Sequence, residues 1–164
     1  MLGRTNITTV KGGTIVSDVE DFTWNEVGTL RVDGAFKRTF LGNNVLVAVT
    51  EGGTVIYSRD GENWEEAVYG TDAEYKIVDG VWDGKRFVFA ANDPAIITTE
   101  DFQEYKSYEI PGAQRLFAIF YNTDGTYTVI GAYPKSSNST AVALYKGMPE
   151  GMECAAEIEH MINS

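Results

Sequence analysis

The fold of this chain is indicated by a strand signal that reads Asn43-Asn44-Val45-Leu46-Val47-Ala48-Val49. The signal returns as Gly84-Lys85-Arg86-Phe87-Val88-Phe89-Ala90 and again as Gly125-Thr126-Tyr127-Thr128-Val129-Ile130-Gly131. The three copies begin at positions 43, 84 and 125, so the period is 41 residues. A period of about 40 residues built from short strands is typical of β-propellers, in which each repeat is one four-stranded antiparallel sheet. We therefore expect an all-β chain.

Turn residues divide each repeat into strands. The Gly42-Asn43-Asn44 turn, for example, holds residue types that tolerate positive φ. The predicted strands are 35–41, 45–50, 54–58 and 64–68, then 77–82, 86–91, 95–99 and 105–110, then 116–121, 127–132 and 141–145, with a polar loop over 133–140. We predict a single propeller domain over residues 1–164, with repeat units at about 2–27, 35–69, 76–110 and 115–158.

The first unit is incomplete, because residues 2–27 supply only the second, third and fourth strands of a repeat. Propellers commonly close their ring by completing one blade from both chain ends, and residues 153–162 are the candidate for that strand. The Ala and Glu content of this tail favours a helix instead, so a closing strand and a short C-terminal helix both stay open. Four units predict a closed four-bladed ring, or half of a ring shared by two chains.

Composition excludes several classes of partner. The chain has 164 residues, with 24 Asp and Glu against 13 Lys and Arg, which gives a net charge of −11. Nucleic-acid phosphates and anionic membranes would be repelled over most of such a surface, so neither is expected as a partner. The lone Cys154 cannot form an intrachain disulfide, and the amino terminus has no apolar signal core. A cytoplasmic location is the expectation.

One turn carries a recognisable motif, Ser58-Arg59-Asp60-Gly61-Glu62-Asn63-Trp64. Looser copies end in Asp101-Phe102-Gln103-Glu104-Tyr105, one period later, and in Asp21-Phe22-Thr23-Trp24, in the first unit. The string resembles the Asp-box, the bacterial neuraminidase (BNR) repeat of sialidase-like propellers. Hydroxyl and carboxylate oxygens in a tight hairpin accept backbone N–H bonds, and the aromatic residue packs between blades. We therefore assign structural turn roles to Ser58, Asp60, Gly61, Trp64, Thr99, Asp101, Tyr105 and Asp21.

The resemblance to sialidases also implies an arginine cluster, a tyrosine nucleophile with a glutamate partner, and an acidic proton donor. The six arginines of this chain are instead scattered through the repeats, and its one histidine, His160, lies near the end. Zinc and calcium spacings are absent from the sequence. We therefore expect no cofactor, no metal and no catalytic residue. The alternative is a minimal sialidase-like glycoside hydrolase that uses Glu51, Asp93 and Tyr133.

Recognition residues are expected on the side of the propeller that faces away from the Asp-box turns. Successive strands run in opposite directions, so alternate turns share a side, and this second side has the longer loops. Tyrosine and arginine are favoured at recognition sites. The candidates are Arg31, Glu51, Tyr69, Tyr75, Asn92, Asp93, Arg115 and Tyr133.

These observations predict a non-catalytic binding module that presents its loop-rich face to a protein or glycan partner. By analogy with propellers of phage and prophage structural proteins, a host-recognition role in a virion is one setting for it. A structural or sequestering protein, with a small ligand held in a homo-oligomer, is a further alternative.

Overall fold

The computed structural model describes residues 2–3, 22–23, 31–69, 75–136 and 139–158. The chain divides into two compact units, Met1–Leu30 and Arg31–Ser164. In the first unit, β1 (Leu2–Gly3) and β2 (Phe22–Thr23) pair in antiparallel fashion. The predicted turn residue Asp21 lies outside the described residues.

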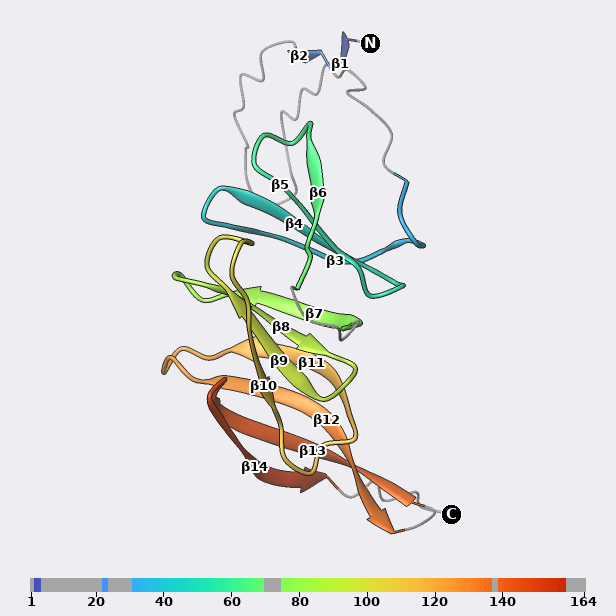
Figure 1. Cartoon of the computed structure of the whole chain (residues 1–164), viewed down its shortest axis with the longest axis vertical. Helices are drawn as coiled ribbons and strands as arrows, with labels where there is room; N and C mark the ends of the chain where they lie inside the picture. The colour runs from blue at the N-terminus through green and yellow to red at the C-terminus, as the bar shows by residue number, and fades with distance from the viewer. Residues whose placement is uncertain (1, 4–21, 24–30, 70–74, 137–138, 159–164) are drawn as a thin grey trace, which may run out of the picture. The chain divides into compact units, whose positions relative to one another are not determined.

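The second unit consists of three four-stranded antiparallel sheets, each with its strands in chain order (Figure 1). All secondary-structure elements of the described residues are β-strands, which confirms the all-β prediction. No helix that could cross a membrane is present in this part of the chain. The strands are β3 (Phe36–Gly42), β4 (Val45–Thr50), β5 (Val55–Ser58) and β6 (Trp64–Glu66); β7 (Ile77–Trp82), β8 (Phe87–Ala91), β9 (Ala95–Thr99) and β10 (Lys106–Glu109); β11 (Arg115–Tyr121), β12 (Tyr127–Ser136), β13 (Ser139–Met148) and β14 (Gly151–Ile158).

The third sheet differs from the prediction in two places. The predicted loop over 133–140 is wrong, because β12 extends to Ser136 and β13 already begins at Ser139. The C-terminal tail forms neither the short helix nor a closing strand for the first unit over its described part. It is β14, which pairs with β13 and buries Met152 to 6% exposure. Pairing and burial here override the helix propensity of Ala and Glu.

The first strand of each sheet carries a β-bulge at the same place. The register shifts between Phe36 and Arg38 in β3, between Ile77 and Asp79 in β7, and between Leu116 and Ala118 in β11. Lys37, Val78 and Phe117 are therefore the unpaired residues of three equivalent bulges. Bulges bend a strand and redirect a side chain, so these positions are suited to shaping a surface.

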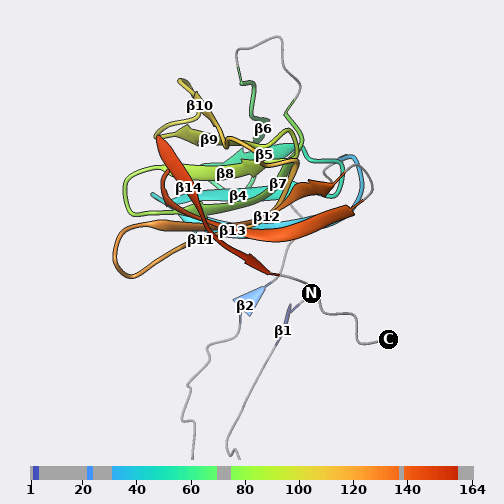
Figure 2. The same cartoon turned by 90° about the horizontal axis from the view of Figure 1, so that it is seen from below.

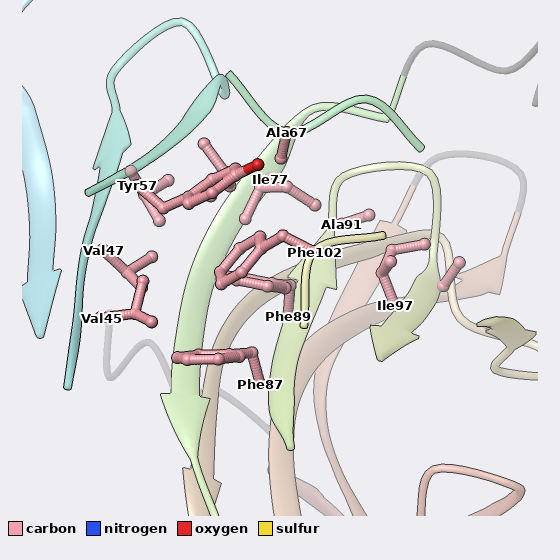
Figure 3. Packing of buried hydrophobic residues seen from close by; sticks show 13 residues of the cluster. Val45, Val47, Tyr57, Ala67, Ile77, Phe87, Phe89, Ala91, Ile97 and Phe102 are labelled. Atoms are coloured by element: carbon pink, nitrogen blue, oxygen red, sulfur yellow. The ribbon is translucent and has the colours of Figure 1, made fainter. Parts of the chain in front are cut away.

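Two cores lie between the three sheets, on opposite faces of the middle sheet β7–β10. The first is aromatic: the rings of Tyr57 and Phe102 stack at 4.1 Å, and Phe87 and Phe89 are fully buried beside them (Figure 3). A Cβ at Gly80 would lie 2.5 Å from the ring of Phe89, so only glycine permits this close packing. The second core is mainly aliphatic and includes Val88, Ile96, Leu116, Ile119 and Val129.

The first strand of the middle sheet, β7, contacts both β3 and β11 (Figure 1, with a second view in Figure 2). Asp79 of β7 joins them, since its Oδ1 lies 3.3 Å from Nε of Arg38 in β3 and its Oδ2 accepts the Ile119 N–H of β11 at 3.0 Å. The Asp79 side chain is only 16% exposed, which strengthens both interactions relative to a solvated pair. Asp79 thereby joins β7 to both β3 and β11.

Candidate binding groove

A groove of about 330 Å³ lies where the first strands of the three sheets begin. Each sheet contributes to it: Lys37 from the bulge of β3, Lys76 just before β7, and Arg115 at the start of β11. The turn after β4 supplies Glu51, and the turn after β8 supplies Asn92. We call this hollow the cationic groove, and its polar side chains are Lys37, Glu51, Lys76, Asn92 and Arg115.

The groove carries three cations and one carboxylate, although the chain as a whole carries a net charge of −11. Lys37, Lys76 and Arg115 are all exposed. Among the described residues, no hydrogen bond or ion pair engages the side chain of any of the three. Their charges are therefore available to an external anion.

The carboxylates near the groove are engaged with donors of their own sheet. Oε2 of Glu51 lies 3.4 Å from a backbone N–H, and the carboxylate of Asp33 accepts bonds from the hydroxyls of Thr50 and Thr54. The bond from Thr50 is the main cause that holds the pKa of Asp33 below its usual value, and the charge of Lys76 acts in the same direction. These acids order the turns around the groove and keep their negative charge, so they offset part of the charge of the three cations and leave the groove net positive.

The apolar part of the groove is formed by the first strands themselves. Leu116 and Ile77 are buried at 1% exposure and form its floor. The bulged residue Phe117 is 45% exposed and stands in the lining. A ligand in the groove would thus contact an aromatic ring beside the cations. Aromatic and positively charged side chains are often found together in recognition sites.

The structure brings together three of the eight predicted recognition residues, Glu51, Asn92 and Arg115. Tyr75 and Asp93 line a second hollow of about 340 Å³, together with Pro94 and Glu109. This second hollow has no Lys or Arg in its lining.

The other predicted recognition residues have different positions. The ring of Tyr69 packs edge-on against the rings of Tyr75 and Tyr105, with ring centroids 6.1 and 5.2 Å away. Its hydroxyl has no hydrogen-bond partner among the described residues, and burial raises its pKa. Tyr133 lies in β12 and packs partly buried against the second core. Arg31 is exposed and does not line the cationic groove.

Lys37, Lys76 and Phe117 were not predicted as recognition residues, although the spacing of the cations along the sequence is a signal for the two lysines. Positions 37, 76 and 115 are cationic and 39 residues apart, so a cation stands near the start of each first strand. All three residues lie at strand starts rather than in loops, and Lys37 and Phe117 are bulged residues there.

The turn over 58–64 is held by hydrogen bonds of its own side chains. Oγ of Ser58 accepts the N–H of Gly61 at 2.8 Å, and Oδ1 of Asp60 accepts the N–H groups of Glu62 and Asn63 at 2.9 and 2.7 Å. The side-chain bond from Asn63 is the main cause that holds the pKa of Asp60 far below its usual value. Gly61 has a φ of 81°, which favours glycine.

The turn one period later repeats this pattern with one change. Oγ1 of Thr99 accepts the N–H of Phe102 at 2.9 Å, and Oδ1 of Asp101 accepts the N–H groups of Gln103 and Glu104 at 2.9 and 3.4 Å. Phe102 has a φ of 63° at the position equivalent to Gly61, and its ring is buried at 4% exposure in the first core. Trp64 and Tyr105, the aromatic ends of the two motifs, are both half-buried.

The residues of the hydrolase alternative do not meet in one place. Glu51 lines the cationic groove, Asp93 lines the second hollow, and Tyr133 packs against the second core. In the described part of the chain, no group of three or more His, Cys, Asp or Glu side chains could hold a metal ion. The arrangement thus offers charge complementarity for binding rather than a convergent acid, base and nucleophile.

Comparison with known proteins informs the fold alone. No protein-family model and no curated protein matches the chain. Among solved structures, the chain is similar to the crystal structure of the N-terminal domain of Nup159, with a TM-score of 0.52 and 7% identity over 77% of this chain and 38% of that one. It also matches a structure of YCF48 bound to D1 peptide, with a TM-score of 0.40 and 14% identity over 82% of this chain and 56% of that one. This chain spans less than two thirds of the length of either, and the Nup159 likeness marks the sheet arrangement as propeller-like.

Proposed function

We propose that this chain is a non-catalytic binding module whose cationic groove binds a carboxylate-bearing ligand on a protein or glycan partner. One observation carries the proposal. Lys37, Lys76 and Arg115 converge from three different sheets, and no described acidic side chain pairs with them. Three folded sheets are needed to build this arrangement, so it is a property of the fold and not of one loop.

The expected affinity and ligand size follow from the exposure of the groove. Exposed ion pairs contribute about 0.2–1 kcal/mol each, so three cations account for about 0.6–3 kcal/mol, or roughly threefold to 150-fold in affinity. The net charge of −11 repels long polyanions, but this repulsion is screened beyond about 8 Å at physiological salt. A short acidic segment therefore suits the groove better than an extended polyanion.

Fluorescence anisotropy with a labelled hexa-aspartate peptide, and competition with an oligogalacturonate, test the proposal. The combined variant Lys37→Gln, Lys76→Gln and Arg115→Gln should lose about threefold to 150-fold in affinity. The matched control is Arg59→Gln, Lys85→Gln and Lys106→Gln, which removes the same charge from exposed residues outside the groove. Equal losses in the two variants would show that net charge rather than the groove governs binding, and no binding to the native chain would refute the function.

We also propose that the three sheets are consecutive blades of a ring, and that the chain is related to the Asp-box propellers. The equivalent bulges of the first strands support the ring, and the hydrogen bonds of Ser58 and Asp60 support the relationship. A closed four-bladed ring and half of a dimeric ring differ in mass by a factor of two, which light scattering measures directly.

A further inference from the structure

We infer that the ligand of the cationic groove is an extended protein segment in which acidic residues are joined to apolar residues, and that it lies along β3, β7 and β11. The inference rests on the proposed function of the groove and names its partner class. The surface concerned is formed by these three first strands, and we call it the first-strand surface.

Exposed apolar side chains gather on this surface. Eight large apolar side chains are exposed in the described part of the chain, and five of them belong to β3 or β11. Scattered single cases need no explanation, but a concentration on adjacent strands is typical of an interaction site. The five are Phe36 (49% exposed), Leu41 (61%), Phe117 (45%), Phe120 (51%) and Tyr121 (44%).

A further hollow on the first-strand surface, which we call the apolar hollow, is larger than the cationic groove and mostly apolar. It has a volume of about 430 Å³ and is bordered by all three first strands. Leu41 comes from β3, Val81 and Trp82 come from β7, and Phe120 and Tyr121 come from β11. Arg38 is the only charged side chain in its lining, and its Nε lies 3.3 Å from Asp79. This apolar hollow would hold aliphatic or aromatic side chains of a ligand.

The apolar hollow and the cationic groove are bordered by the same three strands and follow each other along β3 and β11. On β3 the lining of the groove ends at Lys37 and that of the hollow begins at Arg38. On β11 the corresponding residues are Phe117 and Ile119. A strand of seven residues such as β3 is about 23 Å long at 3.3 Å per residue. An extended peptide of about seven residues would therefore reach from the cations to the apolar hollow.

Charge and shape favour a peptide over the other occupants. A second copy of this chain that used the same surface would place cations opposite either cations or apolar side chains, and neither complements them. An acidic glycan would satisfy Lys37, Lys76 and Arg115, but its hydroxyls would face the aliphatic groups of Leu41 and Val81. A peptide with a carboxylate block and apolar anchors complements both parts.

The test uses two labelled synthetic peptides of equal length and charge with the full chain. One has three aspartates followed by Gly-Leu-Phe-Leu, and the other has three aspartates followed by Gly-Ser-Ser-Ser. The first should bind the native chain at least tenfold more tightly in fluorescence anisotropy. The double variant Leu41→Ser and Phe120→Ser should remove this gain and leave the affinity for the serine peptide unchanged.

Val68→Ser with Met148→Ser is the matched control, because both side chains are exposed and neither lines the two hollows. Circular dichroism checks folding, and Leu41→Ser alone replaces the double variant if that does not fold. Equal affinities of the native chain for the two peptides would overturn this inference and leave the groove function standing. Binding of neither peptide would overturn both. A dimer in light scattering that Leu41→Ser and Phe120→Ser converts to a single chain would assign the surface to a second copy.

Discussion

At one end of the three sheets, four aspartates accept backbone N–H groups of their own turns, whereas at the other end three cations have no partner among the described residues. The first group is Asp60, Asp83, Asp101 and Asp124, and we call their end of the sheets the Asp-turn end. The second group is Lys37, Lys76 and Arg115 in the cationic groove. Charges that are engaged in turns specify the fold, and charges that are left unpaired are available to a ligand.

Cations at the Asp-turn end are also paired. Nη1 of Arg86 lies 2.8 Å from Oε1 of Glu150, and the hydroxyl of Tyr127 donates to Asp83. Burial alone would raise the pKa of Asp83, but bonds from Tyr127 and from Arg86 hold it below its usual value. This network joins the second and third sheets through polar groups that satisfy one another. Substitutions at the Asp-turn end should therefore change stability, and substitutions in the groove should change binding.

The largest expected effect is that of Phe102→Ala. The ring fills the first core at 4% exposure, so we expect a loss of about 3–5 kcal/mol in the free energy of unfolding. Urea denaturation measures it. Phe117→Ala, at an exposed position of the groove, should cost less than about 1 kcal/mol and weaken peptide binding instead. Equal costs for the two substitutions would contradict the contrast between the two ends.

Ser58→Ala should have an intermediate effect. The hydroxyl is 1% exposed and accepts the N–H of Gly61, so its removal leaves a donor of the turn without this partner. We expect a loss of about 1–2 kcal/mol in thermal or urea unfolding and an unchanged affinity for the acidic peptide. The exposed Ser107→Ala serves as control, with a change of less than about 0.5 kcal/mol. A Ser58→Ala variant as stable as this control would show that the motif does not stabilise the turn.

The smallest effect concerns pH. The pKa values of Asp60 and Asp101 are lowered by hydrogen bonds, and that of Asp124 is lowered to about 2, chiefly by the bond from Thr126. Carboxylates with lowered folded-state pKa values stabilise the fold above their unfolded pKa of about 4, and this contribution is lost as the pH falls through the folded values. Stability should therefore decrease from pH 5 towards pH 2, and less steeply for Asp60→Asn with Asp101→Asn. Parallel pH profiles would refute the assignment.

Regular features of the chain were predictable from its sequence, and exceptions to its repeat were not. The period located β4, β7 and β9 with their observed bounds, because alternating apolar residues and turn residues are local signals. For the tail that forms β14 the sequence left a strand and a helix open, and it did not indicate β13 as the partner, because the pairing itself decides the conformation. Phe102 at positive φ could not be foreseen either, since only the buried stack on Tyr57 accounts for it.

The recognition residues were predicted only in part for a related reason. Glu51, Asn92 and Arg115 follow from the alternation of turns, which the sequence reveals. Tyr69 and Tyr133 were chosen because tyrosine is common at interfaces, but the same ring is equally suited to packing against a core. The three equivalent bulges could not be predicted, because no residue type at Lys37, Val78 or Phe117 marks a bulge.

Photo-crosslinking tests the central claim most directly. A benzophenone-labelled peptide with three aspartates followed by Gly-Leu-Phe-Leu is irradiated with the native chain, and the products are mapped by mass spectrometry. We predict crosslinks to the first-strand surface, centred on 36–41 and 115–121, that a lysine-containing peptide of the same length does not give. Crosslinks confined to the turns over 58–64 and 99–105, which lie outside the first-strand surface, or equal labelling by the two peptides, would contradict the account.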